Sequence, residues 1–489
     1  MSAVAWIAVG SLIAWGWLLL GQGFYWRTDQ RLPRRTDPAR WPSVAVVVPA
    51  RDEAEMLPVS LPSLLVQDYP GEAWIILVDD CSGDGTGQLA RELAARYGGL
   101  PLTVVEPGEP EPGWTGKLWA LRHGIALARR HKPDFLLLTD ADIAHEPDSL
   151  RDLVAAAGAE GPAGYDLVSQ MARLRVESFW ERLVVPAFVY FFGQLYPFRR
   201  VNRAESRTAA AAGGCVLLRT EAAERARIPE SIRQAVIDDV SLAREVRRGG
   251  GRIWLGLADR VDSVRPYPRL TDLWRMVARS AYAQLRHSPL LLAGTVPGLL
   301  LVYVAPPATL AAGLATGDAV AAWAGGLAWA VMTVTYLPML AYYRQSPWLG
   351  PLLPLTAVLY LLMTVDSAVQ HYRGRGRPGR AGRTHGRSRT RPLAGTEVWP
   401  PAGTEGPDRT WRPVGAEPLG RTWRRGPGRT ERLGPRPGGD ATGARACRVT
   451  GRAAESGVRG AARKPVRRGS GGLGRTAHLR PGVQFMPQP

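Results

Sequence analysis

Asp140 and Asp142 are the residues in this sequence whose type and spacing most directly suggest chemistry. They follow the apolar run 136–138 and Thr139, and one residue, Ala141, separates them. On an extended backbone this spacing places both side chains on one face. Open α/β sheets bind ligands at the carboxyl ends of their strands, where two such oxygen donors suit Mg²⁺ or Mn²⁺ carrying a diphosphate. The alternative is a strand-end turn with two solvated aspartates, because Asp-x-Asp is a common pattern.

Two further acidic pairs close apolar runs earlier in the chain. The β-branched run 44–48 is followed by Asp52 and Glu53, and the run 74–78 by Asp79 and Asp80. Helical apolar spacing at 55–67 and 86–97 alternates with strand-like runs at 102–105 and 135–138. This alternation predicts an α/β fold with a mostly parallel sheet covered on both faces. Three acidic strand ends at one crevice would repel each other unless cations or hydrogen-bond donors lay between them.

A later acidic pair, Asp238 and Asp239, opens a helical segment that continues to Arg248. An acid at this position can complement the helix dipole, or it can act as a base in a group transfer. A further strand is predicted at 165–171, and Gly213 and Gly214 precede another at 216–218. Small residues there would let a ligand approach the backbone closely.

The order and spacing of these motifs resemble glycosyltransferase family 2. The motifs are Pro-Ala-Arg-Asp-Glu at 49–53, Val-Asp-Asp-Cys-Ser-Gly-Asp-Gly-Thr at 78–86, Gly-Trp-Thr-Gly-Lys-Leu-Trp-Ala-Leu at 113–121 and Thr-Asp-Ala-Asp at 139–142. The resemblance covers roughly residues 43–285 and is strongest to members associated with hopanoid biosynthesis. It implies a GT-A nucleotide-diphospho-sugar transferase fold over a domain at 43–287. The implied reaction takes a sugar from a nucleotide diphosphate, usually of uridine, with inversion at the anomeric carbon.

The resemblance also implies roles for individual residues. Asp140 and Asp142 would hold a divalent metal, Mg²⁺ or Mn²⁺, and Asp239 would be the catalytic base. Asp238 precedes it as a second catalytic acid, where the family more often has Glu. The implied donor-binding residues lie at strand ends and in the motifs: Asp52, Glu53, Asp79, Asp80, Lys117, Asp140, Gly214 and Arg279. For Lys117 the alternative is a solvated loop residue.

Residues 275–280 lie where processive members of the family carry Gln-x-x-Arg-Trp. Met276 and Ser280 replace the Gln and the Trp, so only Arg279 remains. This departure favours a single transfer over a processive polysaccharide synthase. A membrane scaffold with an inactive domain is the non-enzymatic alternative, and the intact acids argue against it.

Apolar segments predict an integral membrane protein. Residues 3–20 suit a membrane helix and are followed by arginines, which predicts an anchor at 1–26 with its amino terminus outside and the catalytic domain in the cytoplasm. Apolar runs at 290–314, 319–343 and 349–368 predict two or three more crossings within 290–370. Three crossings would leave the following basic segment outside, against the positive-inside rule. The alternative is that one run is re-entrant, and 290–314 is the candidate because it contains Pro297, Pro306 and Pro307. The expected location is the cytoplasmic (inner) membrane.

The aromatic segment 177–200 is bounded by arginines and is short for a crossing. An interfacial helix that brings the crevice to a membrane lipid or polyisoprenoid acceptor is our expectation. A buried core helix is the alternative.

The net charge of +19 does not indicate a nucleic-acid-binding domain. From residue 373 onward Lys and Arg outnumber Asp and Glu by 26 to 7, whereas residues 1–372 contain 36 of each. We therefore expect no specific nucleic-acid partner for the folded part. The Arg/Gly/Pro-rich segment 373–489 is predicted to be disordered, with binding to anionic lipid or RNA as the functional alternative. Three scattered cysteines suggest a reducing compartment rather than a disulfide framework or a zinc site.

Overall fold

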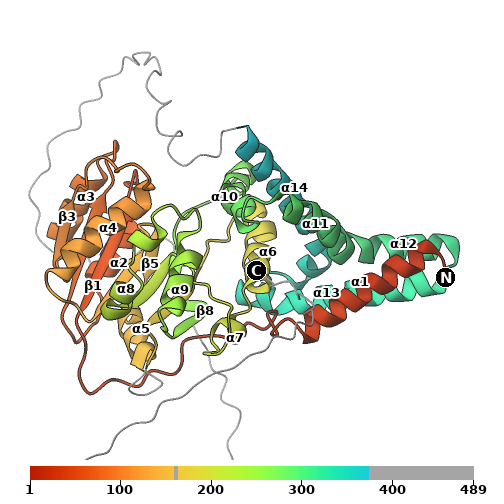
Figure 1. Ribbon diagram of the computed structural model, residues 1–489, viewed down its shortest axis with the longest axis horizontal. Coiled ribbons are helices and arrows are strands. Elements are labelled where there is room, and N and C mark those ends of the chain that lie inside the picture. Colours follow the sequence, from red (N-terminus) through yellow and green to blue (C-terminus); the bar gives the residue numbers. More distant parts are fainter. Residues whose placement is uncertain (159–163, 374–489) are drawn as a thin grey trace, which may run out of the picture. The chain divides into compact units, whose positions relative to one another are not determined.

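The computed structural model describes residues 1–158 and 164–373, so the predicted basic tail lies almost entirely outside the described residues. Their central feature is a mixed sheet of eight strands in the order β3-β2-β1-β4-β7-β6-β8-β5 (Figure 1). The strands are β1 (Val44–Ala50), β2 (Ala73–Asp79), β3 (Leu102–Val105), β4 (Phe135–Thr139), β5 (Ile143–His145), β6 (Leu167–Arg173), β7 (Cys215–Arg219) and β8 (Ile253–Ser263). The α/β prediction is confirmed.

Strands β1 to β4 form the parallel half of the sheet and set the position of the first three acidic pairs. β1 lies between β2 and β4 and is parallel to both, with Ala50 opposite Asp79 and Val47 opposite Leu138. Because parallel strands end at the same edge, the residues after β1, β2 and β4 emerge side by side.

The helices of this domain cover both faces of the sheet. They are α2 (Leu57–Leu65), α3 (Thr86–Tyr97), α4 (Gly116–Arg129), α5 (Ser149–Gly158), α7 (Phe198–Val201), α8 (Thr220–Arg225) and α9 (Asp238–Arg248). Alternate residues of β1 enter different cores: Val46 packs with α2 and α5 residues, and Val47 packs with α4 residues. Gly124 allows the close approach of α4, since a Cβ there would lie 2.4 Å from Val47 Cγ1.

The second half of the sheet contains two strands that our sequence analysis did not predict, β5 and β8. β5 pairs antiparallel with the end of β8, with Ile143 opposite Ser263. One further backbone hydrogen bond, from Val264 N–H to Asp142 O (2.9 Å), continues this pairing beyond β5. The residues after β8 are thereby placed beside Asp142.

Four helical segments among the described residues are long and apolar enough to cross a membrane: Ala3–Leu20, Pro289–Thr316, Ala319–Tyr342 and Pro347–Tyr372. The first is α1 (Ala3–Leu20). The second comprises α11 (Pro289–Leu299), the π-helical η3 (Leu300–Val304) and α12 (Ala305–Thr316). The others are α13 (Ala319–Tyr342), and η4 (Pro347–Leu352) with α14 (Leu353–Tyr372). They agree with the four apolar runs in the sequence.

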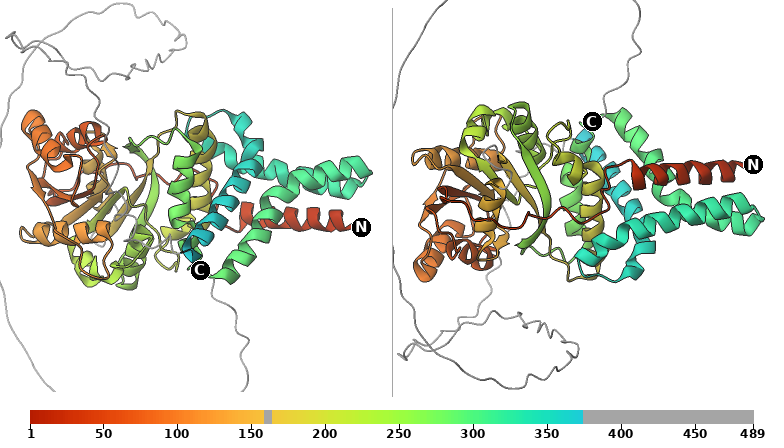
Figure 2. Two further views of the ribbon diagram at one scale, coloured as in Figure 1. Left: turned by 90° about the horizontal axis from the view of Figure 1, so that it is seen from above. Right: turned by 90° about the horizontal axis from the view of Figure 1, so that it is seen from below.

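Helices α1, α12 and α13 run side by side and extend away from the sheet (Figures 1 and 2). At their far end Ser2 Oγ hydrogen-bonds to Asp318, in the turn between α12 and α13. At the near end Tyr342 Oη donates to Ala258 O of β8 (2.6 Å). The amino terminus and the α12–α13 turn therefore lie at the end of this bundle remote from the sheet.

The last apolar segment begins beside the middle of α13 and ends against a helix outside the bundle. Trp329 in α13 donates to Pro351 O in η4 (3.2 Å). At the other end of α14, Asp366 accepts from Trp274 Nε1 (2.8 Å) in α10 (Leu270–Gln284). Ser367 Oγ also accepts from Tyr282 N–H (3.1 Å). The end of α14 is thus fixed to α10, the helix that follows the last strand of the sheet in the chain.

Helix α6 (Phe179–Leu195) begins with a capping box, in which Ser178 and Glu181 satisfy each other's backbone amides. Its Val184, Val185 and Tyr190 are buried against the sheet domain, α13 and α14 rather than turned toward solvent or lipid. In Figure 1 it lies between the sheet and the apolar bundle. Most of the apolar surface of α6 thus contacts protein, as in the core-helix alternative, and its position at a membrane surface stays a prediction.

Candidate active site

Backbone amides of the loop after β2 donate hydrogen bonds to the first two donor-binding candidates, Asp52 and Asp79. Asp52 has a left-handed backbone (φ +53°), and its Oδ1 accepts from Gly83 N–H (2.8 Å). Asp79 is 6% exposed, and its Oδ1 accepts from Ser82 N–H (3.0 Å). A Cβ at Gly87 would lie only 2.5 Å from Asp79 Oδ2. The motif glycines and serine thus wrap backbone around both carboxylates, which fixes their orientation before any ligand binds.

Asp80 points in a different direction from Asp79. It is 4% exposed and pairs with Arg51 (3.3 Å). Its Oδ2 lies so close to the start of α4 that a Cβ on Gly116 would be 2.6 Å away. A carboxylate at a helix amino terminus is stabilised by the helix dipole. Asp80 therefore braces α4, the helix that carries Lys117, and this placement supports a structural role for it.

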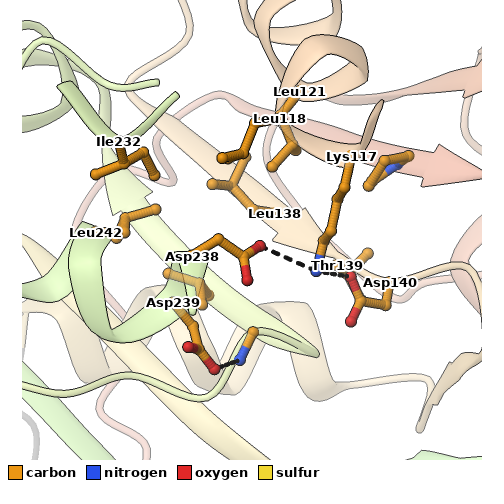
Figure 3. A pocket seen from close by; sticks show the side chains of 13 residues that line it. Lys117, Leu118, Leu121, Leu138, Thr139, Asp140, Ile232, Asp238, Asp239 and Leu242 are labelled. Atoms are coloured by element: carbon orange, nitrogen blue, oxygen red, sulfur yellow. Dashed lines mark hydrogen bonds and ion pairs between the residues drawn. The ribbon is translucent and has the colours of Figure 1, made fainter. Parts of the chain in front are cut away.

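Lys117 joins two acids that are 98 residues apart in the sequence. It lies in the first turn of α4, and its Nζ is 2.7 Å from Asp140 Oδ1 and 3.2 Å from Asp238 Oδ2 (Figure 3). Burial would lower the pKa of Lys117, but the two carboxylates outweigh it and hold that pKa above its ordinary value. The amine is therefore a permanent cation rather than a solvated loop residue.

Asp239 is held by the backbone instead of by a cation. Its Oδ2 accepts from Gly213 N–H (3.0 Å) and its Oδ1 from Val240 N–H (2.7 Å). Burial and the neighbouring Asp238 raise the pKa of Asp239 to about 7. For Asp238, burial acts in the same direction, but Lys117 outweighs it and lowers the pKa. The two neighbours therefore differ: Asp238 stays ionised as a partner of Lys117, and Asp239 exchanges its proton near neutral pH.

These residues line a small pocket between α4 and α9 (Figure 3). Its walls are apolar side chains from β4, α4, α9 and the segment before α9: Leu118, Leu121, Leu138, Ile232 and Leu242. Apolar walls exclude water from one side of the acids, which strengthens the charge interactions inside. The pocket thus brings together Lys117, Asp140, Asp238 and Asp239.

Asp142 belongs to a second cluster, built around Arg265, which our sequence analysis missed. Arg265 Nη2 lies 2.5 and 2.6 Å from the two carboxylate oxygens of Glu53, and its Nε donates to Asp142 Oδ2 (3.1 Å). Ser263 Oγ donates to the same Asp142 oxygen (3.2 Å). Glu53 thus faces a guanidinium next to Asp142. Arg265 has no local signal in the sequence, because only the pairing of β8 with β5 brings it here.

Gly214 and Arg279 lie at the margins of the site. Gly214 O accepts from Thr139 Oγ1 (2.8 Å), and a Cβ on this glycine would lie 3.1 Å from Ile143 Cδ1. Its small size therefore serves the packing of β7 beside the Asp140 loop. Arg279 is exposed on α10 and near enough to Asp238 to stabilise its negative charge.

The donor set can be compared with the needs of a divalent cation. No group of three or more His, Cys, Asp or Glu residues within 1–158 and 164–373 is arranged to hold a metal ion. Within these ranges Asp140 Oδ2 and Asp142 Oδ1 accept no hydrogen bond, whereas their other oxygens do. Mg²⁺-type ions are commonly held by one or two carboxylates plus substrate phosphates. The two aspartates fit that mode of binding.

A mixed sheet with acidic loops at the ends of β1, β2 and β4, followed by an acid at the start of a later helix, defines the GT-A class of nucleotide-sugar transferase folds. Residues 42–283 match the family described as glycosyltransferase like family 2. The chain belongs to glycosyltransferase family 2 through this domain, as its motifs predicted.

Several characterised proteins are similar to parts of the chain. It is 32% identical over 145 residues to the undecaprenyl-phosphate 4-deoxy-4-formamido-L-arabinose transferase of Aeromonas hydrophila, covering 28% of this chain and 40% of that one. It is 35% identical over 101 residues to the 4,4'-diaponeurosporenoate glycosyltransferase of Staphylococcus haemolyticus, covering 21% and 24%. These matches therefore span less than half of each relative's length.

A solved structure, the mannosyltransferase PcManGT from Pyrobaculum calidifontis in complex with GDP-Man and Mn²⁺, has a TM-score of 0.45 to this chain. It is 20% identical, and the match covers 74% of this chain and 99% of that one.

Proposed function

We propose that this protein transfers one sugar from a nucleotide-diphosphate donor, with a UDP-sugar as the first to test, to a lipid acceptor with inversion. The observation that carries this proposal is a pocket lined by Asp239 and by Lys117, which forms ion pairs with Asp140 and Asp238. It combines a carboxylate that titrates near neutral pH with a fixed cation at the edge where this fold binds ligands.

In the proposed reaction an acceptor hydroxyl oxygen forms a bond to the anomeric carbon as the bond from that carbon to the diphosphate breaks. The electron pair of the broken bond leaves with the diphosphate, and Asp239 takes the hydroxyl proton. The two backbone amides that hold Asp239 fix its direction. Lys117 supplies positive charge at the phosphate side of the pocket, and Asp238 keeps it protonated and in place.

Asp140 and Asp142 would hold the divalent cation that the family resemblance implies. When bound, that ion supplies charge stabilisation for the departing diphosphate. The loop residues Asp52 and Asp79, already oriented by backbone amides, would hold the nucleoside part of the donor.

The acceptor we propose is an isoprenoid lipid. Two similarities support this: one relative acts on undecaprenyl phosphate, and another is a 4,4'-diaponeurosporenoate glycosyltransferase. The apolar helices beside the domain would bring such a molecule to the crevice. The motif resemblance adds hopanoids to the acceptors to test. Met276 is partly buried and packs against the apolar core. Its departure from the processive motif favours a single transfer.

The decisive experiment measures transfer from radiolabelled UDP-sugars to extracted membrane lipids, with and without Mn²⁺. Wild type is compared with Asp142→Ala and Asp239→Asn in the same membranes. We expect Mn²⁺-dependent labelling of lipid with wild type and a loss of at least hundredfold with either variant. Equal labelling by all three proteins would overturn the assignment. Mass spectrometry of lipids from cells with and without the gene would identify the product.

We also propose that the protein is an integral protein of the cytoplasmic membrane with its catalytic domain in the cytoplasm and its amino terminus outside. The basic residues after α1 support this orientation. Crossings by α1, by the segment from α11 to α12 and by α13 would return the chain to the sheet side, where Tyr342 contacts β8. The segment 347–372 would then be re-entrant, because α14 ends against α10 on that same side.

Thiol labelling in sealed vesicles tests this orientation. Cys81 is exposed in the catalytic domain and serves as the internal reporter. With Cys447 replaced by serine in every protein, a membrane-impermeant maleimide applied to right-side-out vesicles should label a Thr316→Cys variant but neither Cys81 nor a Tyr372→Cys variant. Labelling of Tyr372→Cys from outside would show that 347–372 crosses the membrane and would overturn the re-entrant assignment.

A further inference from the structure

Arg265 occupies a position that concerns the cation site directly. Its guanidinium lies between Glu53 and Asp142 and bonds to both, and Ser263 donates to the same Asp142 oxygen. The Arg265 side chain is one-third exposed, whereas those of Glu53 and Asp142 are 17% and 15% exposed. Such a charged three-residue contact is stronger than a surface ion pair, because water screens it less.

Acids outnumber cations where these two clusters meet. Lys117 and Arg265 each contact two carboxylates, and Asp239 contacts neither cation. An excess of negative charge at the end of a sheet attracts a divalent cation. However, the guanidinium already neutralises one of the two aspartates on which that cation depends.

We propose that Arg265 is a positioning residue that keeps the cation site weak until a donor diphosphate arrives. This inference rests on the proposed function in taking Asp142 as a metal ligand. With Arg265 in place, a divalent cation bound to the other oxygen of Asp142 would lie close to the guanidinium. Both groups are positive, so their repulsion weakens the binding of the cation. A diphosphate adds negative charge and gives the guanidinium a new bidentate partner. Cation and donor would therefore bind together rather than separately.

The inference has a quantitative consequence for metal binding in the absence of any sugar. Loss of one positive charge within a few ångström of a divalent ion should tighten its binding by about tenfold, even with strong solvent screening. The enhancement of Mn²⁺ affinity by UDP should shrink in the same variant, because coupling between the two ligands is reciprocal. A purely structural role for Arg265 predicts neither change.

The experiment measures Mn²⁺ binding to the full-length protein in detergent micelles by the electron paramagnetic resonance signal of free Mn²⁺. Titrations are run without nucleotide and with UDP. Arg265→Gln removes the charge, and Arg265→Lys keeps it. Arg173→Gln is the matched control, since Arg173 also forms a two-bond pair with an aspartate, Asp262 (2.8 and 3.2 Å), at a similar exposure. Thermal unfolding of each variant reports whether it is folded.

We expect Arg265→Gln to bind Mn²⁺ about tenfold more tightly than wild type without nucleotide, and Arg265→Lys and Arg173→Gln to stay within threefold of wild type. Adding Asp142→Asn to Arg265→Gln should abolish the gain. A change below twofold in Arg265→Gln, an equal gain in Arg265→Lys or Arg173→Gln, or a gain that survives Asp142→Asn would overturn the inference. Because no acceptor or transfer step is involved, the result is independent of whether the proposed transferase activity is found.

Discussion

Replacement of Asp239 is the sharpest test of the assignment of catalytic roles. In Asp239 each carboxylate oxygen accepts from one backbone amide, of Gly213 or of Val240. In Asp239→Asn the single side-chain oxygen can accept from only one of these amides, and an NH₂ group faces the other. The loss of one such hydrogen bond costs about 1–3 kcal/mol of folding free energy. The variant also has no carboxylate to take a proton. The loss of general base catalysis is worth about 10²–10⁴-fold in kcat.

The transfer rate of the wild type should depend on pH through the ionisation of Asp239, and the size of this dependence can be predicted. With a pKa of about 7, about nine-tenths of Asp239 is ionised at pH 8 and about one-tenth at pH 6. The rate should therefore fall about tenfold per pH unit well below 7 and reach a plateau above about 8. The acidic limb should be absent from the residual activity of Asp239→Asn.

The folding stability contributed by Asp239 should fall as the pH rises, whereas the transfer rate should increase. The pKa of Asp239 in the folded protein lies above its ordinary value, so the stability it contributes is fully present below about pH 4 and is lost as the pH rises to about 7. Asp239→Asn has no such loss. The difference in melting temperature between variant and wild type should therefore shift in favour of the variant from pH 5 to pH 8.

The assay is transfer from a radiolabelled UDP-sugar in detergent-solubilised protein between pH 5 and 9, with melting followed by fluorescence on the same samples. Asp239→Glu serves as the matched variant that keeps a carboxylate. If the acceptor attacked through an oxygen that is already ionised, no base would be needed and Asp239→Asn would keep most of its activity. A loss below threefold in Asp239→Asn, or an acidic limb that persists in it, would refute the role of Asp239 as base.

The remaining predictions concern the other parts of the site. Lys117→Met removes the positive charge proposed to face the phosphates and leaves Asp140 and Asp238 to repel them, so calorimetry should show UDP binding at least tenfold weaker; unchanged affinity would contradict the role of the lysine. Gly87→Ala places a methyl group 2.5 Å from Asp79 Oδ2 and should also weaken UDP binding about tenfold by shifting that carboxylate; wild-type affinity would show that Asp79 is not part of the nucleotide site. Trp274→Phe removes the hydrogen bond to Asp366 and should lower stability by about 1 kcal/mol, seen as a lower melting temperature. Removal of divalent ions by EDTA should abolish transfer, and Mn²⁺ should restore it; full activity in EDTA would refute metal dependence.

The sequence predicted those parts of the site that consist of a strand and the loop directly after it. The runs before Asp52, Asp79 and Asp140 are the strands β1, β2 and β4, and their parallel pairing brings the acids to one edge. The start of α9 at Asp238 was also predicted. In these places apolar runs and turn residues act over a few residues, so local patterns suffice.

Contacts between distant segments were not predictable from such patterns. Arg265 reaches Asp142 only because β8 pairs with β5, and nothing near residue 265 indicates that partner. Lys117 follows a glycine-rich stretch that favours a loop, but the structure begins α4 at Gly116, where Asp80 stabilises the helix start. Helix α6 has the aromatic composition of an interfacial helix, and only tertiary packing decides that its apolar surface meets α13 and α14.

The attachment of α10 to the end of α14 has a consequence for regulation by the lipid environment. Asp366 and Ser367 hold α10 through Trp274 and Tyr282, and the same helix carries Arg279 toward Asp238. A change in hydrophobic thickness alters the tilt of apolar helices. Tilt of α14 would be transmitted through these hydrogen bonds to Arg279, which stabilises the negative charge of Asp238. The rate of the proposed transfer should therefore vary with acyl-chain length in reconstituted bilayers.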